Sequence, residues 1–165
     1  MTAYGRFSYK DIIDELAILT EFLSDFIVAT QVLRTQAHHG YIIMQDFLHE
    51  FEFVTWANFA LVEHDFIRIV EANRAIIHAY GLSLDLLGNK GLQRSFAASI
   101  FRKRELALMN NVLVIREATY TVRIVDLNLI QLERCKDISL LRRLVDQWCF
   151  KLSRYLLKDN FKLEI

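Results

Sequence analysis

The sequence has no proline and only five glycines in 165 residues, so few positions force the backbone to bend. The glycines stand at positions 5, 40, 81, 88 and 91. Long segments with helical spacing of apolar residues lie between them. This scarcity favours a few long helices over many short elements joined by turns.

Long apolar runs are also absent. The longest segments without Asp, Glu, Lys or Arg are 35–45, 53–62, 75–84 and 106–115, all shorter than the ~18–20 residues that a membrane-spanning helix needs. The first residues meet Asp11 and Asp14 early, which is unlike a signal peptide. We therefore predict a cytoplasmic protein that does not span a membrane.

The chain has only two cysteines, Cys135 and Cys149. On a single helix, residues this far apart would be separated by on the order of 21 Å, which is too far for a disulfide. We predict reduced thiols in the core, in agreement with a cytoplasmic location.

Apolar residues, by contrast, are abundant. They make up 53% of the chain, which includes 12 Phe, and the mean hydropathy is +0.20. This composition excludes a disordered chain. It predicts either a large core or apolar surface that a partner covers.

The spacing of these apolar residues predicts four helices, at about 8–39, 41–80, 92–134 and 137–160, with Gly81 directly after the second. The third helix has a seam with steps of three and four: Leu108, Val112, Ile115, Thr119, Val122, Val125, Leu129 and Leu132. The segment 112–125 is rich in β-branched residues, so a strand is an alternative there. The period of 3.5 and the lack of a turn signal favour the helix.

Short connections between four helices predict antiparallel neighbours. The expected fold is therefore all-α: one domain, 1–165, forming an antiparallel four-helix up-and-down bundle with two long central helices. The fourth helix would bury a seam of Leu141, Val145, Trp148, Leu152 and Tyr155.

Charge is unevenly distributed although the net charge is zero. Residues 1–82 contain 5 Lys/Arg and 11 Asp/Glu, a net of −6, whereas residues 83–165 contain 15 and 9, a net of +6. Complementary halves of this kind can neutralise each other within one bundle or across a dimer.

One group of polar residues is expected inside the bundle. A buried carboxylate or guanidinium needs a partner, so we predict that Asp65 pairs with Arg116 or Arg123 where the second and third helices meet. The resulting polar core layer, or alternatively ligand pocket, would consist of Asn58, Asp65, Arg116, Tyr120 and Arg123. His64 and Asp65 are neighbours pointing about 100° apart, so we do not expect them to pair.

A metal site has weak support. Asp46, His49 and Glu50 share one helical face, but no Glu-x-x-His occurs anywhere in the chain. We interpret these residues as a solvated face and expect no cofactor. A metal- or cofactor-binding bundle, which could also use His64 and Asp65, remains an alternative.

The basic half offers candidate contacts for a nucleic acid or a protein partner. The residues are Arg102, Lys103, Arg104, Arg143, Lys151, Arg154 and Lys158. A basic stripe is typical of nucleic-acid binders, although their pI usually exceeds 9 and this chain's is about 7.0.

No nucleophile motif or phosphate loop is present. We therefore predict a non-enzymatic protein that acts through protein–protein contact as a regulatory, adaptor or assembly subunit. Self-association as a homo-oligomer is expected. The alternative is a nucleic-acid-binding accessory protein that uses the basic C-terminal half.

Overall fold

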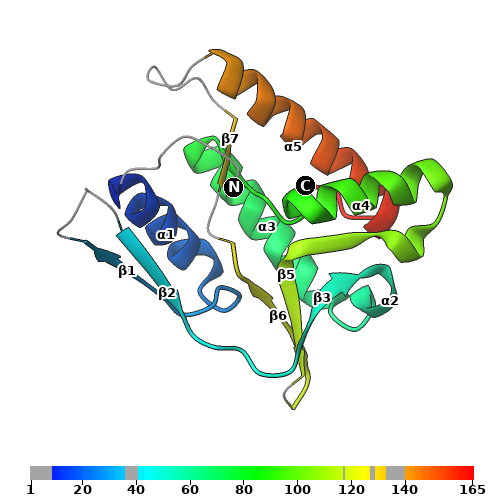
Figure 1. Ribbon diagram of the computed structural model, residues 1–165, viewed down its shortest axis with the longest axis horizontal. Helices are drawn as coiled ribbons and strands as arrows, with labels where there is room; N and C mark the ends of the chain where they lie inside the picture. The colour runs from blue at the N-terminus through cyan, green and yellow to red at the C-terminus, as the bar shows by residue number, and fades with distance from the viewer. Residues whose placement is uncertain (1–8, 36–40, 117, 127–128, 133–139) are drawn as a thin grey trace.

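The computed structural model describes residues 9–35, 41–116, 118–126, 129–132 and 140–165, and it is a mixed α/β fold (Figure 1). The prediction of an all-α four-helix bundle is therefore wrong. The elements in chain order are α1 (Tyr9–Leu23), β1 (Thr30–Arg34), β2 (Tyr41–Gln45), β3 (Phe51–Thr55), α2 (Trp56–Phe59), α3 (Glu63–Tyr80), β4 (Leu82–Leu84), α4 (Gly88–Phe101), a 3-10 turn η1 (Arg104–Leu106), β5 (Leu108–Arg116), β6 (Tyr120–Ile124), β7 (Leu129–Gln131) and α5 (Leu140–Phe161).

The described strands form three antiparallel sheets. The central one has the order β3-β5-β6, with a bulge between Phe53 and Val54. The strands β1 and β2 form a separate two-stranded sheet, and β4 pairs with β7. In Figure 1 the β1–β2 sheet lies beside α1 at one edge of the molecule, whereas α4 and α5 lie at the opposite edge.

The prediction of one helix at 92–134 is wrong because this range contains the strand β5. This strand is buried at seven of its nine positions, including every residue from 111 to 115. Successive side chains of a strand point to opposite faces, so β5 is buried on both faces. A strand of this kind has no polar–apolar alternation, and its apolar run also fits a helical period. The β-branched residues that indicated the strand alternative, Val112, Val114 and Ile115, were the correct signal.

The other predicted helices are shorter than expected or divided. Helix α1 ends at Leu23 and is followed by β1, so 8–39 is not one helix. Within 41–80 only Trp56–Phe59 and Glu63–Tyr80 are helical. The C-cap at Gly81 is confirmed: its φ of 64° is left-handed, and its N–H donates to the carbonyl oxygen of Ile77.

Helix α5 agrees with the prediction of a helix at 137–160 from residue 140 onward, but it buries a different face. Val145, Trp148 and Tyr155 of the predicted seam are exposed. The buried residues are instead Ser153, Leu156, Leu157, Asn160 and Phe161. The seam prediction fails because it assumed three neighbouring helices.

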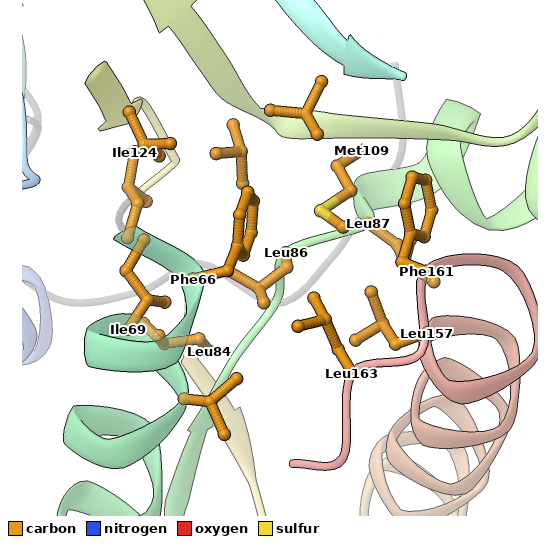
Figure 2. Packing of buried hydrophobic residues seen from close by; sticks show 14 of the residues in the cluster. Phe66, Ile69, Leu84, Leu86, Leu87, Met109, Ile124, Leu157, Phe161 and Leu163 are labelled. Atoms are coloured by element: carbon orange, nitrogen blue, oxygen red, sulfur yellow. The ribbon is translucent and has the colours of Figure 1, made fainter. Parts of the chain in front are cut away.

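The core joins α3 to the sheet and to the end of α5. Figure 2 shows Phe66 and Ile69 of α3 facing Ile124 of β6, with Leu157 and Phe161 of α5 beyond Met109 of β5. The segment 84–87 crosses this core and contributes three buried leucines: Leu84, Leu86 and Leu87. Among the described residues, no helix is long and apolar enough to cross a membrane.

Buried polar side chains tie helices to strand backbones. Asn73 of α3 is fully buried, and its Oδ1 accepts the N–H of Leu84 at 2.8 Å. Ser95 of α4 is also fully buried, and its Oγ donates to the carbonyl oxygen of Leu108 at 3.2 Å. These bonds fix the position of a helix along a strand and, with the bond from Asn73 Nδ2 to Ser83 Oγ, give the buried side-chain polar atoms of both residues partners.

The helix α4 approaches β5 closely through a glycine. The segment 81–91, which separates the predicted second and third helices, contains β4 and the first turn of α4. A Cβ added at Gly91 would lie 2.6 Å from the carbonyl oxygen of Leu108 and 3.0 Å from the amide nitrogen of Asn110. Both contacts are with backbone, which cannot move aside as a side chain can.

We therefore expect Gly91→Ala to reduce the free energy of unfolding by about 1–3 kcal/mol, because α4 must shift away from β5. Lys90→Ala, at the neighbouring exposed position, is the control for helix propensity and should stay within about 0.5 kcal/mol of wild type. Urea unfolding followed by circular dichroism measures both. A Gly91→Ala variant as stable as wild type would contradict the close packing.

Candidate functional site

The predicted polar core layer is not formed as one unit. Asp65 is 4% exposed, and its Oδ2 accepts the N–H of Val122 on β6 at 3.0 Å. Its Oδ1 lies 3.0 Å from Nε2 of His64, so the expectation that these neighbours do not pair is wrong. The carboxylate is therefore satisfied without an arginine, and its position ties the start of α3 to β6.

The two arginines expected near Asp65 have other partners. Arg123 Nη1 donates to the backbone oxygen of Asp25 at 2.9 Å and to that of Val122 at 3.1 Å. The guanidinium of Arg116 lies 5.8 Å from the centre of the Tyr120 ring. Asp25 also receives a bond from Arg68, at 2.6 Å.

Three of the five predicted residues do meet, in a cleft of about 330 Å³. We call it the Arg116 cleft; it is lined by Glu50, Phe51, Glu52, Asn58, Leu61, Val114, Arg116 and Tyr120. Asn58 is held there because its Oδ1 accepts the N–H of Thr55 at 2.8 Å and its Nδ2 donates to the backbone of Phe53. The lining of the cleft thus contains the carboxylates of Glu50 and Glu52 and the guanidinium of Arg116.

The weak metal candidates are not gathered around a common point. Asp46 follows β2 and donates its N–H to Ala29, His49 lies edge-on to Phe47, and Glu50 lines the Arg116 cleft. Within the described ranges, no group of three His, Cys, Asp or Glu side chains is placed to hold a metal ion.

Another cleft lies between α2, α4, η1 and α5 and has a volume of about 780 Å³. We call it the Trp56 cleft; its lining is Trp56, Ala98, Ser99, Arg102, Arg104, Glu105, Tyr155, Asp159 and Asn160. A volume of this size is in the range of small-molecule sites. Two exposed aromatic rings and two arginines thus share one cavity.

The polar floor of the Trp56 cleft is preorganised. Ser99 donates its hydroxyl to Asp159 Oδ2 at 2.6 Å. Asn160 is 1% exposed, and its Nδ2 lies 3.1 Å from the backbone oxygens of Ser95 and Leu156. Its Oδ1 is buried and accepts no hydrogen bond from the described part of the chain. A buried acceptor without a donor is unfavourable by about 1–3 kcal/mol.

A second, smaller cleft adjoins the first. This Lys151 cleft, of about 270 Å³, is lined by Lys151, Arg154, Tyr155, Lys158, Glu164 and Ile165. Tyr155 lines both clefts, so we call the pair the joined clefts, in the sense that they share this residue. Lys158 lies 2.6 Å from Glu164, and this bond lowers the pKa of the Glu164 carboxyl below its ordinary value.

The structure brings most of the predicted basic contacts to these two clefts. Arg102 and Arg104 line the first, and Lys151, Arg154 and Lys158 line the second. Lys103 is exposed between the two arginines, and the side chain of Arg143 lies outside the described residues. Sequence reasoning missed Trp56, because it placed this residue inside a long bundle helix.

Exposed apolar side chains form another surface that sequence reasoning missed. The β1–β2 hairpin exposes Leu33, Ile42, Ile43 and Met44, and Phe47 just after it is 79% exposed. A second apolar stripe runs along α5 through Val145, Trp148 and Tyr155. The high mean hydropathy was a signal for such surface, but it does not say where the surface lies.

Cys149 is free and half-buried, and burial raises the pKa of its thiol, with Asp146 and Asp85 adding to the shift. A raised thiol pKa favours the unreactive protonated form. Cys135 lies outside the described residues.

The chain matches no protein family, no curated protein and no solved structure at a significant level. Its function must therefore be argued from the surfaces and clefts described above.

The bond between Asp65 and Val122 makes a testable contribution to stability. We expect Asp65→Ala to reduce the free energy of unfolding by about 1–3 kcal/mol, because the buried N–H of Val122 loses its acceptor. Asp65→Asn keeps an acceptor and should lose clearly less. Urea unfolding compares the two variants, and equal losses would show that the backbone bond is not what Asp65 provides.

The part-buried carboxyl of Asp85 predicts a dependence of stability on pH. Burial raises its pKa above 3.8; the Gly88 N–H opposes the shift, and Asp126 adds to it. The folded state thus disfavours ionised Asp85, and stability falls as pH rises through the raised pKa. Asp85→Asn, which can still accept the Gly88 N–H, should gain stability relative to wild type from about pH 3 to pH 7. Thermal unfolding at several pH values in this range measures the stability difference between the variant and wild type. A difference that does not change with pH would contradict the raised pKa of Asp85.

Proposed function

We propose that this protein acts through protein–protein contact and self-associates through the outer face of the β1–β2 hairpin. The single observation that supports this most strongly is the exposure of Leu33, Ile42 and Met44, of which Ile42 is 52% exposed. Apolar side chains gathered on one exposed face are typical of interaction sites.

The register of the hairpin places these side chains together. Leu33 lies directly opposite Ile42, so both point to the same face, and Met44 follows two residues later on that face. Val32 and Ile43 form a pair on the other face, where Val32 is half-buried and Ile43 is 41% exposed. The hairpin therefore has one partly covered face and one exposed face that carries Leu33, Ile42 and Met44.

Open strand edges add to this surface. Neither β1 nor β2 has a second neighbour among the described strands. A two-stranded sheet is marginal by itself and gains stability when a further strand or a packed face covers it. Arg34 is the one charged residue in the two strands, so few charges oppose the addition of another strand.

A second copy of the chain fits this surface better than an unrelated partner. An isologous contact places the same apolar face on both sides of a two-fold axis, so no separate complementary surface is needed. Complementary charge is also present in one chain: residues 1–82 are acidic and residues 83–165 are basic. Contact between the unlike halves of two copies would be electrostatically favourable.

The oligomeric state tests this proposal. Sedimentation velocity over a wide range of protein concentration should give a dimer or larger species for wild type. The double variant Ile42→Lys/Met44→Lys should be monomeric at the same concentrations, because lysines on the outer face cannot be buried in a self-contact. Its circular dichroism spectrum and melting temperature should remain close to those of wild type, since both side chains are exposed.

Ile67→Lys is the matched control, because Ile67 is equally exposed but lies on α3. This variant should associate as wild type does. A wild-type protein that stays monomeric throughout would refute self-association, whereas an oligomer unaffected by the double variant would refute the hairpin as its surface.

A further inference from the structure

We propose that the joined Trp56 and Lys151 clefts bind single-stranded nucleic acid, with bases stacked on the exposed aromatic rings and phosphates held by the surrounding cations. This activity goes beyond self-association and uses a different part of the surface. In Figure 1, α4 and α5 lie far from the β1–β2 hairpin. Failure of one proposal therefore does not decide the other.

The aromatic rings supply the stacking platforms. Trp56 is 48% exposed and Tyr155 is 61% exposed, although both line a cleft. A large ring left in contact with solvent inside a cavity is available to stack on a flat partner. Bases of a single strand offer such flat faces, whereas those of a duplex are already stacked on each other.

The cations follow the same path. Arg102 and Arg104 line the first cleft, and Lys151 and Arg154 line the second, where Lys158 is already paired with Glu164. Because Tyr155 belongs to both clefts, a chain stacked on its ring can extend toward cations on either side. One small anion cannot reach the cations of both clefts at once, whereas a polymer with repeated phosphates can contact both sets.

The acidic residues in the clefts are largely occupied by local partners. Asp159 accepts the hydroxyl of Ser99, and Glu164 is paired with Lys158. Glu105 is exposed at the edge of the first cleft. Carboxylates at this position can accept hydrogen bonds from the amino groups of bases, while the arginines contact phosphate.

An acidic protein segment would use the same cations, but it fits the other observations less well. It offers no regular series of flat faces for Trp56 and Tyr155.

Fluorescence anisotropy of a labelled single strand of about 12 nucleotides tests this proposal with the full-length chain. Wild type should bind the strand at about 50 mM salt and lose affinity steeply toward about 200 mM. A duplex of the same sequence should bind more weakly. No change in anisotropy at the lower salt concentration, or equal affinity for duplex and single strand, would overturn the proposal.

Variants at the shared ring separate stacking from charge. Tyr155→Leu should weaken binding by about tenfold, because an aliphatic side chain cannot stack on a base. Tyr155→Phe keeps the ring and should bind as wild type does. Equal affinities of the Leu and Phe variants would overturn the role of Tyr155, whatever the cause of the binding.

The cations have their own readout and control. Arg104→Ala/Arg154→Ala should make the slope of log affinity against log salt shallower by about 1.4, the value expected for two lost phosphate contacts on a single strand. Arg116→Ala removes an arginine beside a tyrosine in the separate Arg116 cleft and should leave the slope unchanged. A shallower slope for Arg116→Ala together with an unchanged slope for the double variant would place the binding site in the Arg116 cleft and overturn the proposal.

Two unlabelled competitors distinguish the other possible occupants. A mononucleotide should compete far less well than the strand, because it reaches only part of the joined clefts. Polyglutamate should likewise compete poorly, because it cannot stack. Displacement by either competitor as effective as that by the strand would overturn the assignment to single-stranded nucleic acid.

Discussion

The burial of β5 on both faces is the constraint on which the rest of the structure depends. Val112, Val114 and Ile115 are buried on both faces of this strand, so helices and strands must cover most of its length. Polar side chains then fix the covering elements in place. Ser95 holds α4 against β5, and Asp65 holds the start of α3 against β6. The close approach at Gly91 completes this arrangement and positions α4, which forms one wall of the Trp56 cleft.

The same constraint explains why the sequence suggested a different fold. A strand buried on both faces reads as a continuous apolar run, and in 108–116 that run also has the steps of a helix. Glycine or proline usually marks the turn of a hairpin in a sequence. The residues between β5 and β6, 117–119, include neither. Features set by local chemistry were predictable: Gly81 ends α3, and α5 forms close to its expected bounds. The pairing of β3 with β5 joins residues far apart in the sequence, and no local pattern encodes it.

The candidate sites follow the same division. Basic residues can be located from composition alone, and five of the seven predicted contacts line the two joined clefts. Trp56 and Tyr155 could not be assigned to these clefts, because their exposure depends on how α2 and α5 meet. The polar residues of the expected core layer were correctly recognised as unusual, but Asp65 found a backbone N–H instead of an arginine. A carboxylate can be satisfied by either, and only the fold decides between them.

We infer a tightly packed interior and propose two surfaces for partners, and hydrogen–deuterium exchange tests that division most directly. Exchange of the intact chain should be measured at low protein concentration, at high concentration, and at low concentration with a single-stranded oligonucleotide. Peptides covering 108–116 should be the slowest to exchange in all three samples. Those covering 30–34 and 41–45 should gain protection only at high concentration, and those covering 98–105 and 151–160 only with the oligonucleotide. Rapid exchange in 108–116, or protection that rises equally everywhere, would contradict this account.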